Sequence, residues 1–261
     1  MVAVFLIRGC TTKIHSNKII WQATGVIIIL TAWEITSRFF PPLVVPPIEE
    51  VWQSLISLIT QDDFPSTVLM TVMRLIAGLS IGISLGMIIG LISGIFWRAD
   101  CVFAPLLSVL QSVPPVCWVV LALVWFGFNG RPSVFIVAAS TIPTVAINLS
   151  HGVRNIDPKL LEMARLYDLT KSMRIRHIIL PSVKPYLNSA LEIVIGGGWK
   201  LAVMGEVLTT ATGIGGAITT ARLNIDPARI IAWSCLLVCI SFLTAKFLSL
   251  LIAGRHRRCS C

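Results

Sequence analysis

The sequence predicts an all-α membrane protein with about six transmembrane helices and a two-helix cytoplasmic loop between the fourth and fifth spans. Hydrophobic residues make up 56% of the 261 residues and charged residues 13%, with a mean hydropathy of +0.86, so too few polar residues remain to cover a soluble fold. Six apolar stretches are each long enough to cross a hydrocarbon layer of ~30 Å. Basic residues gather in alternate connections between these stretches, as in multi-pass proteins.

The first predicted span covers residues 19–37 and follows a tail at residues 1–18. The apolar start of the tail is too short for a span, and its charges follow that start instead of preceding it. We therefore interpret it as a cytoplasmic tail and not as a signal peptide. Glu34 and Arg38 lie four residues apart at the far end of the span and can form an ion pair there.

A proline-rich connection and a glycine-rich span come next. Four prolines in residues 40–47 exclude a helix, and residues 48–60 have the apolar spacing of an amphipathic helix on the membrane surface. The second span covers residues 68–96. Glycine recurs there at every fourth position, which lines a groove for a closely packed helix: Gly78, Gly82, Gly86, Gly90 and Gly94. We favour helix packing over a pore-lining role.

The middle of the chain is uncharged from residue 101 to residue 130. Its prolines divide it into a short interfacial helix and a third span, residues 106–128. A tight turn over residues 129–132 leads into the fourth span, residues 133–153, which contains Pro143.

The last two spans are predicted at residues 186–212 and 230–253, so that residues 19–253 form one transmembrane domain. Three consecutive glycines, residues 196–198, interrupt the fifth span and would allow unwinding or close packing. Residues 212–216 are interpreted as a flexible connection, and residues 254–261 as a cytoplasmic C-terminal tail.

The distribution of the 21 basic residues sets the orientation. Fourteen fall in the proposed inside segments and four in the outside segments, which places both termini and the loop after the fourth span in the cytoplasm. Because these charges are scattered between apolar spans, nucleic-acid binding is disfavoured. Cys235 and Cys239 have the i, i+4 spacing of metal ligands, but no histidine or acid lies near them in the sequence, so we interpret most of the seven cysteines, this pair included, as small buried residues. Cys259 and Cys261 give only a weak indication of a metal or redox role.

The longest polar stretch is the loop at residues 157–185, called the basic segment below. Asp157 and Pro158 are typical of a helix start, and the helix should end at Asp168. Thr170 can cap a second helix over residues 171–179, which Pro181 should terminate. The first helix has an apolar stripe made by Leu160, Leu161, Ala164 and Tyr167.

This segment resembles the "EAA" loop of inner-membrane permeases in ATP-binding-cassette importers that depend on a binding protein. Glu162-Met163-Ala164, then Asp168, then Leu180-Pro181 match the spacing of that motif, although Met163 and Asp168 replace an alanine and a glycine. The glycine position requires a left-handed turn, which aspartate tolerates better than most residues. Further motifs over residues 40–253 resemble those of the permease subfamily that transports nitrate, sulfonate, taurine and bicarbonate.

The resemblance implies that the basic segment is the coupling helix that docks on a separate ATPase. The resemblance implies that Glu162, Ala164 and Asp168 shape this loop. It also implies contacts between acidic groups on the ATPase and four basic residues, Arg165, Lys171, Arg174 and Arg176. The resemblance also implies a homodimer in a bacterial inner membrane, two cytoplasmic ATP-binding subunits that hold ATP and magnesium, and an external solute-binding protein. The chain has no phosphate-binding loop motif of its own, and attraction to anionic lipid is the alternative role for the basic residues.

Charged residues within the fifth span are candidates for the translocation path, because charge in lipid costs several kcal/mol. On an ideal helix Lys200 and Glu206 are ~120° apart, so each needs another partner, such as Arg74, Glu34, a second subunit or a solvated path. The path candidates are Gly197, Trp199, Lys200, Met204 and Glu206. The alternative role for these charged residues is an internal ion pair. For the whole protein, the alternatives are an ion-coupled transporter or channel, a permease for a neutral or cationic vitamin precursor, and a membrane-embedded enzyme.

Overall fold

The computed structural model describes residue 21 and residues 24–256; the side chains of residues 165, 171 and 248–256 lie outside the description. The described residues are helical, with no strand among them. They divide into two compact units, Met1–Ile59 with Ala221–Ala232, and Thr60–Thr220 with Trp233–Cys261. The predicted tail at residues 1–18 and the last five residues of the predicted C-terminal tail lie outside the described residues.

The first unit agrees with the expectation for the N-terminal region. A helix covers residues 24–39, irregular backbone follows over residues 40–47, and α2 (Ile48–Ile59) forms the amphipathic helix. The predicted ion pair forms, with 3.6 Å between Nη2 of Arg38 and Oε1 of Glu34.

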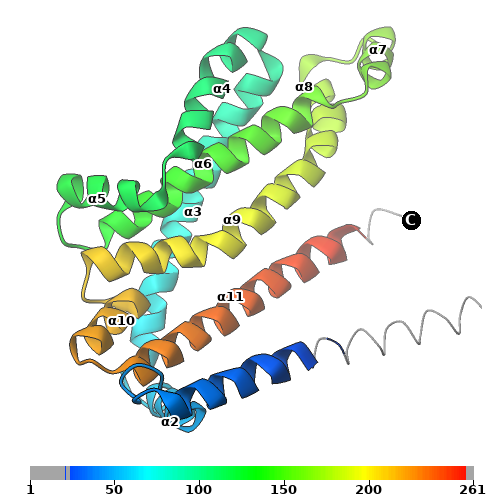
Figure 1. Cartoon of the computed structure of the whole chain (residues 1–261). Helices are drawn as coiled ribbons and strands as arrows, with labels where there is room; N and C mark the ends of the chain where they lie inside the picture. Colours follow the sequence, from blue (N-terminus) through cyan, green and yellow to red (C-terminus); the bar gives the residue numbers. More distant parts are fainter. Residues whose placement is uncertain (1–20, 22–23, 257–261) are drawn as a thin grey trace, which may run out of the picture. The chain divides into compact units, whose positions relative to one another are not determined.

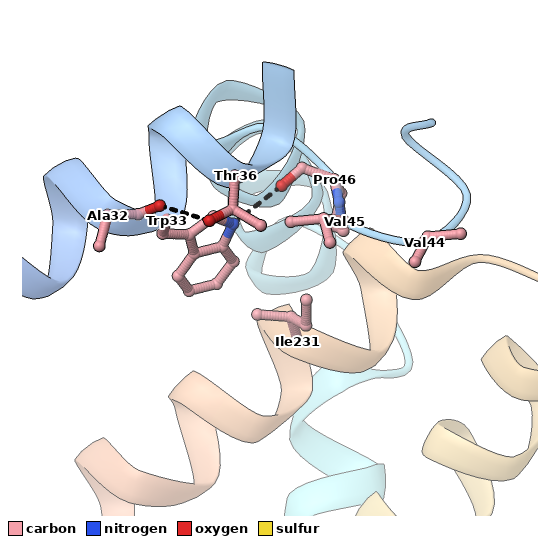
Figure 2. Close-up of a pocket in the computed structure, with 7 residues that line it drawn as sticks. All are labelled: Ala32, Trp33, Thr36, Val44, Val45, Pro46 and Ile231. Atoms are coloured by element: carbon pink, nitrogen blue, oxygen red, sulfur yellow. Dashed lines mark hydrogen bonds between the residues drawn. The ribbon is translucent and has the colours of Figure 1, made fainter. Parts of the chain in front are cut away.

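Trp33 fixes the proline-rich connection against the first helix. Its indole Nε1 donates a hydrogen bond of 3.0 Å to the carbonyl oxygen of Pro46, so the backbone carbonyl of this proline has a partner. Figure 2 shows this bond beside a pocket of about 390 Å³. The pocket is lined by Ala32, Trp33, Thr36, Val44, Val45, Pro46 and Ile231.

The second unit is built on three helices that run side by side, α3 (Phe64–Ile95), α6 (Arg131–Arg154) and α9 (Leu180–Thr209) (Figure 1). The glycine groove of α3 faces α6 along its whole length. A Cβ atom on Gly82 would lie 2.6 Å from Cβ of Thr141, and one on Gly94 2.6 Å from Cβ of Val153. The other three glycines face Val137, Val145 and Ala146. The prediction of close helix packing is confirmed.

Two helices bent against each other connect α3 to α6. α4 (Trp97–Ser112) and α5 (Pro115–Phe126) meet at 95° across the predicted proline break. An Asx turn then closes, because the backbone N–H of Arg131 donates to Oδ1 of Asn129 at 2.9 Å. Asp100 and Arg154 form an ion pair of 2.6 Å that joins α4 to the last turn of α6.

α9 leads into α10 (Gly213–Leu223) and α11 (Pro227–His256). Among the described residues three helices are long and apolar enough to cross a membrane, and up to five if each of two bent helix pairs forms one span. The second such pair is residues 172–209 with α10, bent by 50°. The first predicted span, residues 19–37, includes residues outside the description.

Three expectations about local structure are wrong. The three glycines at residues 196–198 do not interrupt α9, because the helix is continuous through them. Residues 212–216 are held by side-chain hydrogen bonds and start α10, so they are not a free connection. The four described cysteines, Cys101, Cys117, Cys235 and Cys239, are exposed on the single chain, because they lie on faces that no other described helix covers.

Candidate functional site

The first helix of the basic segment, α7 (Pro158–Leu166), begins where the sequence predicts. Oδ1 of Asp157 accepts a hydrogen bond of 2.9 Å from the backbone N–H of Lys159, so one of the unpaired amides of the first turn is satisfied. Pro158 occupies the first helical position, where its missing N–H has no consequence.

Asp168 ends α7 in the left-handed conformation expected for the family's glycine. Its φ is +49°, and the backbone N–H of Leu169 donates to the carbonyl oxygen of Ala164 at 3.0 Å. This six-to-one hydrogen bond is the mark of a Schellman C-cap, with Asp168 at the left-handed position. The bend therefore survives the change from glycine to aspartate.

The second half of the segment differs from the prediction. Thr170 does cap α8 (Lys171–Arg174), with Oγ1 accepting from the N–H of Met173 at 3.4 Å. The chain then continues through a π-helical turn, Ile175–Ile179, directly into α9. Pro181 therefore does not terminate a helix, because the wider turn before it accommodates a residue with no N–H donor.

A small apolar core holds α7 against the helices on either side of it. Ala164 is fully buried with Ile156 and Ile178, and Leu161 packs on this cluster. Ala164 and Leu161 thus confirm part of the predicted stripe. Leu160 and Tyr167 do not belong to it, since both are exposed.

The outer face of α7 is apolar as well as exposed. Leu166 is 85% exposed and Tyr167 74% exposed, with Met163 beside them. Sequence reasoning did not single out Met163 and Leu166 as contact residues. The sequence did contain the signal. This nine-residue helix has apolar residues on both faces, which is more than one buried stripe needs.

The charged residues of the basic segment lie at different depths. Glu162, Asp168 and Arg176 are exposed, and Arg174 is partly buried. The side chains of Arg165 and Lys171 lie outside the description. The helices therefore present a mixed apolar and charged surface and not a purely basic one.

The second site is a polar cluster of Thr71, Arg74, Glu206, Thr212 and Gly215, in which Thr71 and Glu206 are buried. The Glu206 carboxylate is fully buried and accepts three hydrogen bonds: from Nη1 of Arg74 at 2.7 Å, from Oγ1 of Thr71 at 2.9 Å and from the backbone N–H of Gly215 at 3.0 Å. Arg74 also donates to the carbonyl oxygen of Thr212 at 2.9 Å and to its Oγ1 at 2.7 Å.

This polar cluster joins three helices. Arg74 and Thr71 belong to α3, Glu206 to the last turn of α9, and Gly215 to the first turn of α10. A carboxylate at the N-terminus of α10 satisfies an unpaired amide and complements the helix dipole. Of the two roles considered for Glu206, the structure supports the internal ion pair, and its partner is Arg74, one of the candidates named from the sequence. Sequence reasoning missed Thr71, Thr212 and Gly215.

The remaining path candidates separate into two groups. Lys200 is exposed, and Gly197 and Met204 are half-buried on the same side of α9; a Cβ atom on Gly197 would have no neighbour within 4 Å. Trp199 is buried, and its Nε1 donates to Oγ1 of Thr244 in α11 at 3.0 Å. Trp199 therefore has a packing role in this structure.

Residues 82–256 match the family model described as the binding-protein-dependent transport system inner membrane component. The aliphatic sulfonates transport permease protein SsuC of Escherichia coli (strain K12) is 34% identical over 116 residues, 44% of this chain and 44% of that protein. The nitrate import permease protein NrtB of Leptolyngbya laminosa is 33% identical over 111 residues, 42% of this chain and 40% of that protein. The chain thus matches less than half the length of these two relatives.

A longer match covers 88% of this chain and 90% of the taurine transport system permease protein TauC of Escherichia coli (strain K12), at 21% identity. The fold is similar to that of a solved bacterial ABC transporter involved in the import of the acidic polysaccharide alginate. That match covers 92% of this chain and 96% of the solved chain, with a TM-score of 0.59 and 15% identity.

Proposed function

The chain belongs to the family of binding-protein-dependent transport system inner membrane components, and we propose that it moves a small anionic solute into the cytoplasm by alternating access. Two separate cytoplasmic subunits bind ATP with magnesium and hydrolyse it. An external binding protein delivers the solute. A second copy of the chain completes the path, because a single chain of this size does not enclose one. Both termini lie in the cytoplasm of a bacterium.

The observation that carries the proposal is the arrangement of α7. Ala164 packs inward on its own small core, while Met163, Leu166 and Tyr167 are exposed on the other side. A helix fixed at both ends by Asp157 and Asp168, with an apolar outer face, suits insertion into a groove on a partner. The ATPase subunit is that partner, and exposed charged residues such as Glu162 and Arg176 surround the contact. Because the segment resembles the coupling loop, Arg165, Lys171 and Arg174 are assigned to the same contact, where they would meet acidic groups on the ATPase.

An anionic solute is supported by the relatives' names and by Lys200. The relatives are described as permeases for sulfonates, nitrate and taurine. Lys200 lies on an uncovered face of α9, next to the small residue Gly197 and one turn before Met204. A lysine on a face that lines a water-filled path supplies a positive potential that concentrates anions.

The alternative of an ion-coupled transporter or channel rested on charges within the spans. Arg74 and Glu206 form an ion pair inside the fold, so each of these two charges is balanced by the other. That alternative also gives no role to the apolar outer face of α7.

Uptake into proteoliposomes tests the proposal. The chain would be co-expressed with an ATPase subunit and a binding protein from the same genome, and uptake of taurine, an alkanesulfonate and nitrate would be measured with and without internal ATP. Accumulation of an anion that requires ATP and the binding protein is expected. Uptake by the purified chain without ATP would contradict the proposal.

A further inference from the structure

An apolar groove of about 710 Å³ lies at the end of the basic segment, and no residue of the polar cluster around Glu206 lines it. Its walls come from the C-terminal half of α3, Leu149 of α6, the π-helical turn and the first turns of α9. The lining residues are Met87, Leu91, Ile95, Leu149, Ile175, Ile179, Leu180, Pro181, Val183, Lys184 and Leu187. Lys184 is the one charged residue among the described residues that line it.

Lys184 has no acidic partner to balance its charge. It is partly buried, and within the part of the chain that the structure describes its ammonium group forms no ion pair or hydrogen bond. The sequence from residue 169 to residue 191 contains four basic residues and no acidic one. A lysine that is partly desolvated without a counter-charge favours an anion beside it.

The place of the groove in the membrane narrows the choice of anion. The groove lies at the end of α3 that precedes Arg98 and at the start of α9, where the basic segment ends. Basic residues of multi-pass proteins concentrate at the cytoplasmic face, so this end of the helices meets the headgroups of the inner leaflet. Apolar walls with a single lysine at headgroup depth match an acyl chain joined to a phosphate.

A second copy of the chain fits the groove less well. Lys184 and Lys200 are sixteen residues apart on α9, which places them about 160° apart around an ideal helix. The groove therefore faces away from the side of α9 that we assign to the path and the partner copy. We propose that the groove binds one anionic phospholipid of the inner leaflet, with an acyl chain between α3 and α9 and the headgroup phosphate at Lys184.

Native mass spectrometry of the purified full chain tests this proposal. The chain would be titrated with palmitoyl-oleoyl phosphatidylglycerol and with the phosphatidylcholine of the same acyl chains. The wild-type chain should retain one phosphatidylglycerol in preference to phosphatidylcholine. Lys184→Gln should weaken that retention about fivefold, and Lys184→Arg should keep it. Lys159→Gln, a matched loss of charge on α7, should leave it unchanged.

A groove-filling variant separates this site from general contact with charged lipid. Leu91→Trp on the α3 wall, or Leu187→Trp on the α9 wall, should reduce retention of both lipids. Gel filtration would verify that each variant remains monodisperse. Either variant alone is enough for the test, because both fill the same groove. Equal retention by wild type and Lys184→Gln would overturn the proposal, as would unchanged retention in a well-behaved groove-filling variant.

Discussion

Arg74 and Glu206 lie 132 positions apart in the sequence, and their side chains meet at 2.7 Å between Nη1 and Oε1. The glutamate is fully buried and the arginine side chain is 14% exposed. The pair holds α3, the end of α9 and the start of α10 together. The stability of the second unit should therefore depend on both partners.

Glu206→Gln should destabilise the chain strongly, because it leaves the Arg74 guanidinium buried without its counter-charge. Loss of one partner of a buried pair costs about 3–5 kcal/mol. Thermal unfolding in detergent should show a large drop in Tm. Replacing both Arg74 and Glu206 with methionine should cost less than the single change, since no charge is left unpaired.

Glu192→Gln provides the matched control, because Glu192 is an exposed glutamate on the same helix. Its Tm should stay close to that of the wild type. Equal Tm values for Glu206→Gln and Glu192→Gln would contradict the assigned role of the ion pair.

Gly82→Ala should destabilise the chain, and Gly25→Ala should not. A Cβ at Gly82 would lie 2.6 Å from Cβ of Thr141, whereas a Cβ at Gly25 would meet nothing within 4 Å. Overpacking of this kind costs about 1–3 kcal/mol, while alanine in place of an uncrowded helical glycine is neutral or stabilising. Opposite shifts in Tm are expected, and a loss of similar size in both variants would count against the α3–α6 contact.

The sequence predicts the glycine groove and the caps of α7 well because both depend on local spacing. Gly82 and its neighbours repeat at the helical period, and Asp157 precedes a proline at a helix start. The partner of Glu206 could only be narrowed to several candidates, because the contact joins distant segments. Pro181 misled the prediction, since a rule for regular α-helices does not foresee a π-helical turn.

Asp168→Gly should be tolerated, and Asp168→Val should disturb the end of α7. The φ of +49° suits glycine and costs a β-branched residue at least about 1–2 kcal/mol. Hydrogen exchange of residues 158–180 should remain slow in the glycine variant and become faster in the valine variant. Equally slow exchange in both would show that the turn does not depend on the left-handed residue.

Lys200→Gln should lower the rate of anion uptake about tenfold, because it removes the positive potential from the proposed path. Lys200→Arg should retain most of the activity. The assay is ATP-driven uptake into proteoliposomes, with assembly of the transporter verified by gel filtration. If the assembled Lys200→Gln transporter took up the anion at the wild-type rate across salt and solute concentrations, the assignment of Lys200 to the path would be wrong.

The central claim, that α7 docks on the ATPase, is tested most directly by co-purification of the ATPase subunit with two matched variants. Leu166 on α7 is 85% exposed and Leu223 at the end of α10 is 73% exposed, so aspartate at either position should leave the fold intact. Leu166→Asp should lose the ATPase subunit, because a charge enters the apolar docking face, and Leu223→Asp should retain it. Retention of the ATPase subunit by both variants would contradict the account.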